Sequence, residues 1–303
     1  MATASDKVRR ARPLLGTFVE IEVAGAAKSA MNTAIDAAFE AVARVHRLMS
    51  FHEPDSDVSR LNREAFVRPI TVHDWTYQVL QAAVEMHRRS NGMFDIAVAP
   101  ELQAMGLLPG ANDQNPIDAE ARAFDPIELL EGQKVRFRQA NVRIDLGGIA
   151  KGFAVDRALE VLRGFGAAGG IVNAGGDLAV FGEAPQAVHI RHPRDPRRLI
   201  CSVEVTDEAL ASTARRFDPF RSTDTASSAI IDPVRRMPAH AIDGATVRAS
   251  SCMTADALTK IVMIAGTDAT ELLEHYNANA LLISTDGDVQ ITPDWHHAVY
   301  LAA

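Results

Sequence analysis

A short glycine-rich segment carries the side chains that are best placed to do chemistry. Residues 145–152 have the sequence DLGGIAKG and directly precede a stretch whose apolar periodicity predicts a helix closed by Gly166. The first N–H groups of a helix are unpaired and partly positive, so glycines at this point let an anion approach the backbone. Asp145 could accept hydrogen bonds from a ligand, and Lys151 could meet a phosphate as a point charge or be a solvated first-turn residue.

Taken alone, this segment is a weak signal. No Ser or Thr follows Lys151, so the segment is not a phosphate-binding loop, and its glycine spacing differs from the dinucleotide fingerprint. The elements around it must therefore decide what it does.

The N-terminal half predicts alternating strands and helices. Residues 15–23 are rich in β-branched residues and predict a strand, and apolar residues spaced by three and four over 28–49 predict a helix. A second helix is expected over 74–89, with Asp74 as its N-cap. Residues 135–145 alternate apolar and polar side chains about a Gln-Ala-Asn turn, which predicts a β-hairpin that ends at Asp145.

The middle of the chain is expected to be mostly strands. The expected elements are strands over 170–172, 177–181, 188–190, 200–205 and 280–283, a surface loop over 215–227, and a helix over 254–264 that stops at Gly266. No segment has the composition of a linker between independent domains.

Composition excludes several classes of protein. A formal net charge of −8 argues against nucleic-acid binding, and the arginines in 9–12 and 191–198 are interpreted as belonging to solvated loops. Cys201 and Cys252 could form one disulfide at most, and buried thiols are the simpler interpretation. The sequence shows neither a secretory signal nor about eighteen consecutive apolar residues, so we expect a cytoplasmic protein without a membrane span.

Seven sequence blocks, in order, resemble the FAD:protein FMN transferase (ApbE) family over nearly the whole chain. The blocks are LGTFVEIEV, MSFHEPDSDVSRLN, GMFDIAVAPEL, RIDLGGIAKGFAVDRALEVL, VNAGGDLAVFG, AIIDP and TADALTKIVMIAG. The resemblance implies an α+β, ApbE-like (T-fold-related) fold, in which mixed and antiparallel sheets with packed helices form a two-lobed single unit. The whole of 1–303 is then one flavin transferase domain.

The activity that the resemblance implies is a magnesium-dependent transfer of the FMN half of FAD to a threonine or serine of a target flavoprotein, with release of AMP. Phosphoryl-type transfer needs a cation at the pyrophosphate and a base for the attacking hydroxyl. The residues at the family's flavin-nucleotide positions are Leu15, His52, Met93, Phe94, Asp95, Asp145, Lys151 and Ile231. Two of them are substitutions, since the family commonly has Met where this chain has Leu15 and an aromatic residue where it has His52. The Asn173–Asp177 turn resembles a family turn near the cofactor, although a tight structural turn explains its glycines equally well.

The metal site that the resemblance implies departs from the family pattern. Its positions are the Gly148 carbonyl, Asp256 and a family threonine four residues after Asp256, where this chain has Lys260. Thr259 is one residue early and, by helical periodicity, points about 100° away. An ammonium group has no acceptor and cannot bind magnesium. Lys260 therefore either places its charge beside Asp256 and the phosphates as a built-in cation or points outward and leaves a weaker metal site.

A second departure concerns the base. The family has a histidine beside the cofactor where this chain has Ala229, so the catalytic base is not assigned. His240 could compensate, although a lone histidine after Pro-Ala is more often a loop residue.

These departures leave alternatives open. The main hypothesis is an FAD:protein FMN transferase or a related FAD-hydrolysing activity with altered metal use. A second is a non-catalytic FAD- or nucleotide-binding homologue that has lost the metal-dependent chemistry, and a third is a scaffold without a ligand.

Overall fold

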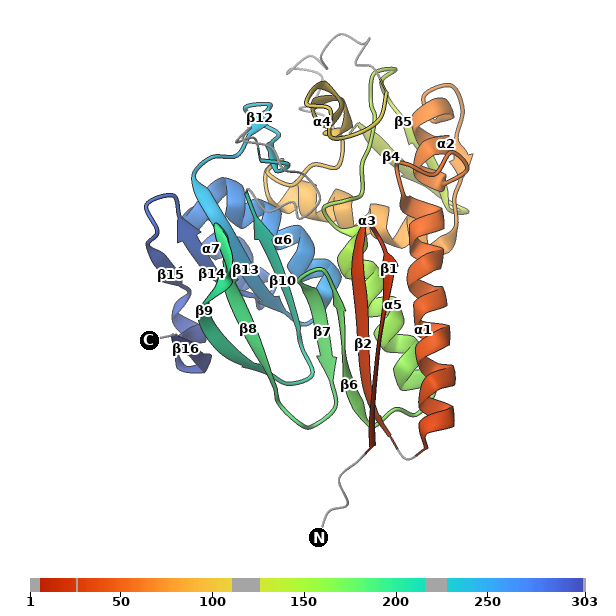
Figure 1. Cartoon of the computed structure of the whole chain (residues 1–303). Coiled ribbons are helices and arrows are strands. Elements are labelled where there is room, and N and C mark those ends of the chain that lie inside the picture. Colours follow the sequence, from red (N-terminus) through yellow and green to blue (C-terminus); the bar gives the residue numbers. More distant parts are fainter. Residues whose placement is uncertain (1–5, 26, 111–125, 216–227, 302–303) are drawn as a thin grey trace. The chain divides into compact units, whose positions relative to one another are not determined.

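The computed structural model describes residues 6–25, 27–110, 126–215 and 228–301 (Figure 1). The chain divides into two compact units. Unit 1 comprises Met1–Ala43, Lys151–Ile230 and Ala239–Ala303, and unit 2 comprises Arg44–Ala150 and Ile231–Pro238. Helices combine with antiparallel sheets, so the expected α+β class is confirmed. Among the described residues, no helix combines the length and the apolar character needed to cross a membrane.

Unit 1 is built on a large antiparallel sheet. Its eight strands, in spatial order, are β1 (Asp6–Leu14), β2 (Thr17–Gly25), β6 (Gly169–Ala174), β7 (Asp177–Phe181), β10 (Ala209–Ala214), β13 (Ile242–Ala249), β14 (Asn279–Ser284) and β15 (Val289–Ile291). A smaller sheet has the order β16 (Val299–Leu301), β9 (Asp195–Val205) and β8 (Gln186–His192).

Strand β7 explains how both faces of the large sheet are covered. All five of its residues are buried. Leu178 and Val180 belong to a core that also contains Val203 of β9 and Trp295. Because side chains alternate along a strand, Asp177 lies on the opposite face. That face packs on helix α6 (Cys252–Ala265), which lies against β7, β10 and β13.

Helices α5 and α1 follow the predicted patterns. Helix α5 (Ala150–Gly164) ends before Gly166, which has a φ of 74°. The remaining short elements are η2 (Gly266–Ala269), α7 (Thr270–His275) and η3 (Pro293–Ala298). Helix α1 (Lys28–Met49) has the predicted bounds and continues from unit 1 into unit 2.

Besides the end of α1, the described residues of unit 2 form three helices and two small sheets. The helices are α2 (Asp57–Glu64), α3 (Asp74–Arg89) and α4 (Ala99–Ala104). One sheet has the order β3 (Ile70–Thr71), β5 (Lys134–Phe137) and β4 (Ile127–Leu130), and the other pairs β11 (Ile231–Asp232) with β12 (Met237–Pro238).

The predicted hairpin over 135–145 is wrong. Only its first half is a strand, β5, whose partners are β3 and β4. The second half finds other hydrogen-bond partners: the Asn62 side chain accepts from Ile144 N at 2.8 Å and donates to Ile144 O at 2.9 Å. A side chain that satisfies both backbone groups removes the need for a strand ladder.

Two smaller predictions are also corrected. The N-cap of α3 is His73, whose ring nitrogen accepts from Trp75 N, and Asp74 is the first helical residue. Both arginine clusters lie largely on strands, where Arg9 of β1 pairs with Glu20 of β2. The loop expected over 215–227 lies outside the described residues after Arg215. The two cysteines are buried free thiols, as the sequence indicated.

Candidate functional site

Two lysines and two buried aspartates form a charge cluster in unit 1. Lys151 comes from the first turn of α5, Asp177 from the start of β7, and Asp256 and Lys260 from α6. The Lys151 ammonium pairs with Asp177 and lies 3.9 Å from Asp256 Oδ1, and the Lys260 ammonium pairs with the same Asp256 oxygen. The four formal charges sum to zero, which lets the carboxylates remain buried.

Tight turns and strand alternation place Asp177 in this cluster. Gly175 and Gly176 have φ values of 68° and 107°, and Asn173 Oδ1 accepts from Gly176 N at 2.9 Å. A side chain at Gly175 would meet Thr17 Oγ1 at 2.6 Å. The glycines of this turn therefore have a structural reason, and the turn also delivers a carboxylate to Lys151.

Helices α5 and α6 approach each other closely at Gly152. An added Cβ there would lie 2.2 Å from the Cys252 carbonyl oxygen. The Gly152 N–H donates to Asp256 Oδ2 at 3.0 Å, so the start of one helix binds a carboxylate of the other. In return, Asp156 of α5 accepts from the N–H groups of Cys252 and Met253 at 2.8 and 2.9 Å, and burial raises the pKa of Asp156 to about 6.

The cluster shifts the pKa values of its own members. Burial by itself lowers the pKa of Lys151, but the charges of Asp177 and Asp256 outweigh it and raise that pKa overall. Burial also raises the pKa of Asp177, and the neighbouring Asp256 charge adds to the effect. For Asp256, burial is outweighed by Lys151 and Lys260, which hold its pKa below the usual range. The pKa values of the two carboxyl groups are therefore shifted in opposite directions, Asp177 upward and Asp256 downward.

All three N–H donors of the Lys260 ammonium group make hydrogen bonds within the protein. Besides Asp256, its ammonium donates to Thr259 Oγ1 at 3.0 Å and to Thr213 Oγ1 of β10 at 3.2 Å. The Thr259 hydroxyl in turn donates to the Asp256 carbonyl at 2.7 Å. Of the two orientations considered for Lys260, the structure shows the inward one.

Lys151 is the more accessible ammonium. Its side chain is 33% exposed, whereas that of Lys260 is 14% exposed. Within the cluster it makes one close contact, to Asp177, so N–H donors remain available for a ligand. Leu15, in the β1–β2 turn, is also partly exposed and has a φ of 55°, which is strained for a leucine.

Most of the other predicted residues lie on unit 2, and several of them meet there. Asp145 donates its backbone N–H to the Ile96 carbonyl at 2.8 Å, which joins its loop to the segment that contains Phe94 and Asp95. Burial raises the pKa of Asp145, while the Gly147 N–H and the nearby His52 work against that rise. This unit thus brings His52, the 93–96 segment and Asp145 together.

The remaining predicted residues have less distinctive surroundings. Phe94 and Ile231 are buried, Met93 and Gly148 are partly exposed, and Asp95 Oδ1 accepts from Ala97 N at 2.8 Å. Ala229 and His240 are exposed residues of unit 1. Sequence reasoning missed Asp177 and Thr213 as members of the charge cluster, although alternation along β7 and β10 was a signal that could have indicated their common face.

The residues present do not fit a magnesium ion at Asp256. Magnesium prefers about six oxygens in octahedral geometry, but both carboxylate oxygens of Asp256 already accept hydrogen bonds, one of them from an ammonium group. Within the described part of the chain, no three His, Cys, Asp or Glu side chains are grouped to hold a metal. One buried acceptor, Asp177 Oδ1, has no hydrogen-bond partner among those residues, and a single oxygen does not make a magnesium site.

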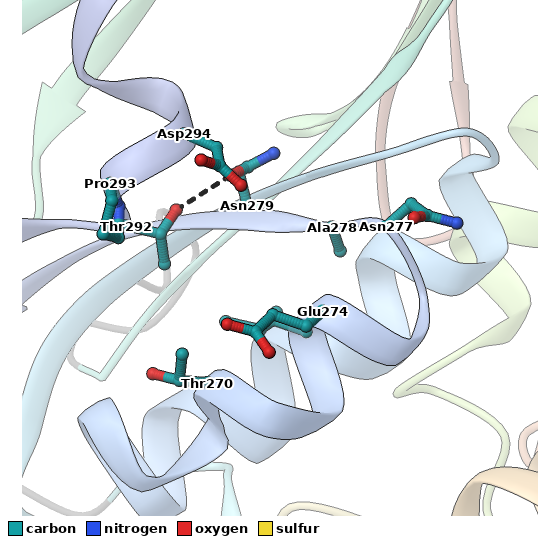
Figure 2. Close-up of a pocket in the computed structure, with 9 residues that line it drawn as sticks. Thr270, Glu274, Asn277, Ala278, Asn279, Thr292, Pro293 and Asp294 are labelled. Carbon is teal, nitrogen blue, oxygen red and sulfur yellow. Dashed lines mark hydrogen bonds between the residues drawn. The ribbon is translucent and has the colours of Figure 1, made fainter.

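A hollow at the C-terminal end of unit 1 is a poor candidate for an anionic ligand. It has a volume of about 430 Å³ and lies between α7, β14 and the start of η3. Figure 2 shows two carboxylates, Glu274 and Asp294, at this hollow, and its lining includes no Lys, Arg or His.

Comparison with known proteins decides the family. The model of the ApbE family matches residues 15–282, which is most of the chain. The chain belongs to the ApbE family. It is 30% identical to a FAD:protein FMN transferase of Vibrio cholerae, over 86% of this chain and 82% of that protein. It is also 29% identical to a FAD:protein FMN transferase of Haemophilus influenzae, over 80% and 76% of the two chains.

Solved ApbE structures share the fold. The crystal structure of the ApbE protein of Thermotoga maritima superposes with a TM-score of 0.84 at 24% identity, over 97% of this chain and 99% of that one. The flavin transferase ApbE from Vibrio cholerae gives a TM-score of 0.80 at 26% identity, with the same coverage. The ApbE membership expected from the seven blocks is thus confirmed.

Proposed function

We propose that this chain is an FAD:protein FMN transferase. The family match along residues 15–282 carries the proposal. The accessible ammonium group of Lys151 supports it, because this group lies at the start of α5 and is paired with Asp177. FAD is the substrate, and a threonine or serine of a target flavoprotein is the acceptor.

The transfer is a substitution at the phosphorus atom of the FMN half. The acceptor hydroxyl forms a new P–O bond, the bond to the bridging oxygen breaks, AMP leaves with that oxygen, and the hydroxyl proton passes to a base. Lys151 would bind a diphosphate oxygen with its free N–H donors and stabilise the charge that develops there. Because Asp177 and Asp256 fix this ammonium in place, little side-chain freedom is lost when FAD binds.

Other residues have proposed roles in holding FAD. Asp145 accepts a hydrogen bond from the nucleotide. Leu15, whose backbone is in the left-handed conformation, makes an apolar contact with FAD through its side chain. The other proposed contacts with the flavin nucleotide come from His52, Met93, Phe94, Asp95 and Ile231. The whole of residues 1–303 is proposed to act as one functional domain.

The test measures both products of the reaction. The protein is incubated with FAD and a threonine-containing peptide from a flavoprotein acceptor, with added Mg²⁺ in one sample and EDTA in another. AMP is quantified by chromatography, and FMN attachment is detected as a gain in peptide mass. We expect both products in the wild type and a loss of rate of about a hundredfold or more in Lys151→Met, with Lys134→Met as the control for loss of one positive charge.

Ala229 favours a second candidate function, that of an FAD-binding homologue without transfer activity. The methyl side chain of alanine cannot take up the proton that the attacking hydroxyl group loses. Tight FAD binding without AMP under either metal condition would establish that candidate and refute transfer. If the wild type neither binds FAD nor releases AMP, both candidates are refuted.

A further inference from the structure

The protein's own ammonium group lies where a divalent cation would have to contact Asp256. Asp256 is fully buried and its Oδ1 pairs with Lys260, four residues later on the same helix face. The two threonine oxygens beside this pair also accept from the ammonium. One carboxylate and two hydroxyl oxygens thus surround a single positive charge, with donors and acceptors matched.

We propose that Lys260 is a permanent internal cation that replaces a divalent metal ion, so that this chain binds the FAD diphosphate without metal. The inference rests on the proposed function, because it takes FAD as the ligand. Lys260 is a positioning residue: its N–H donors are used within the protein, and it acts through its charge and through its hold on Asp256. Lys151 is the group that contacts the diphosphate.

The charge balance of the cluster explains why a metal is not needed. Two ammonium groups and two carboxylates sum to zero, so an approaching diphosphate meets no net negative charge. Without Lys260, the cluster of Lys151, Asp177 and Asp256 would carry a net charge of −1 and would repel the diphosphate. A metal ion added beside an intact Lys260 would have to displace its ammonium from Asp256, against the repulsion of two positive charges.

Two substitutions at this position separate the proposal from an ordinary structural ion pair. Lys260→Met removes the charge and supplies no metal ligand. Lys260→Thr also removes the charge but places a hydroxyl one helical turn from Asp256, next to Thr213 and Thr259, where a divalent ion can bind. Lys134→Thr, at an exposed position of β5, is the matched control for loss of a lysine.

The first measurement is metal binding without FAD. Each protein is dialysed against EDTA and then titrated with Mn²⁺, and free Mn²⁺ is followed by electron paramagnetic resonance. We expect no binding above background in wild type, Lys260→Met and Lys134→Thr, and one bound ion in Lys260→Thr. One tightly bound Mn²⁺ in the wild type would overturn the proposal.

The second measurement is FAD affinity, followed by quenching of flavin fluorescence in EDTA or in excess Mg²⁺. For the wild type we expect dissociation constants that agree within about twofold, which is less than 0.5 kcal/mol. Both variants of Lys260 should bind FAD about tenfold or more weakly in EDTA, and Mg²⁺ should restore affinity only in Lys260→Thr. A wild-type affinity that falls about tenfold in EDTA would overturn the proposal.

These outcomes are distinguishable from failure of the proposed function. If the wild type binds FAD in neither buffer, the function is wrong, while the Mn²⁺ titration still decides whether Lys260 excludes a metal. If Lys260→Thr gains neither Mn²⁺ binding nor a response to Mg²⁺ while it remains folded by circular dichroism, Lys260 does not occupy a cation position and the inference is wrong.

Discussion

The Gly152→Ala substitution would place a methyl group against the backbone of the neighbouring helix. The new Cβ would lie 2.2 Å from the Cys252 carbonyl oxygen and 2.8 Å from Met253 Cα. Neither contact can be relieved by turning a side chain, so the helices must separate by about 1 Å to reach ordinary van der Waals distance. That movement would also stretch the hydrogen bond from Gly152 N to Asp256 Oδ2.

The expected cost follows from three terms. Overpacking of a filled interior costs about 1–3 kcal/mol. Loss of a hydrogen bond to a charged group costs about 1.5–3 kcal/mol. Alanine is favoured over glycine within a helix by about 1 kcal/mol. The free energy of unfolding should therefore fall by about 1.5–5 kcal/mol.

The same helix supplies a matched control. An added Cβ at Gly164, the last residue of α5, would have no neighbour within 4 Å. Gly164→Ala should therefore leave stability unchanged or raise it by up to about 1 kcal/mol. The two substitutions are chemically identical and differ in the expected sign of their effect.

Urea unfolding followed by tryptophan fluorescence tests this difference. The chain has two tryptophans, and Trp295 is fully buried in unit 1. A Trp75→Phe background makes the signal report on unit 1, and free energies are compared from the midpoints at a common slope. Equal midpoint shifts, in the same direction, for Gly152→Ala and Gly164→Ala would refute the close approach of α5 and α6.

Three further predictions follow from the buried charges of unit 1. Burial raises the pKa of Asp156 to about 6 in the folded state, above the usual 3.8, so folding favours the protonated form of this carboxyl group. The stability that the protonated Asp156 contributes is complete below about pH 4 and is lost as the pH rises through about 6. Urea midpoints across this window should fall in the wild type, by at most about 3 kcal/mol in free energy, and should flatten in Asp156→Asn. Lys151→Met should lower the free energy of unfolding by about 2–4 kcal/mol, which is less than the full cost of breaking a buried pair because the lysine is one-third exposed. Adding Asp177→Asn to this variant should recover part of the loss, as measured in thermal melts. Burial would raise the pKa of Asp243, but hydrogen bonds and charge from Arg215 and Arg194 outweigh that effect and lower it. The ion pair of Asp243 with Arg215 therefore stabilises the fold above about pH 4 and loses that contribution as the pH falls. Arg215→Met should lower the free energy of unfolding by about 1–3 kcal/mol at pH 7 and by less at pH 3.

Elements whose packing is local could be predicted from the sequence. Helix α1 has the predicted bounds, 28–49, because one continuous apolar face specifies a helix without knowledge of its partner. Helix α5 and its stop before Gly166 were predicted for the same reason. The family could also be predicted, because ordered blocks along the chain are specific even where each glycine turn alone is weak.

Features that depend on distant partners could not be predicted. The second half of the expected hairpin is not a strand because Asn62, 82 residues earlier, takes both backbone hydrogen bonds of Ile144. Asp177 and Thr213 join the cluster only because β7 and β10 lie under the same helix. Helical periodicity predicted that Lys260 and Asp256 share a face, but whether the ammonium turns inward depends on Thr213 of β10.

The Gly152 amide gives spectroscopic access to the buried carboxylate. It belongs to the first turn of α5, where N–H groups have no acceptor within their own helix, so its hydrogen-bond partner is Asp256 on α6. Its rate of hydrogen exchange therefore reports on whether that carboxylate stays in place rather than on fraying of α5. In a ¹⁵N-labelled sample, one glycine resonance can follow the state of Asp256 while nucleotide or metal is added, without any substitution in the protein.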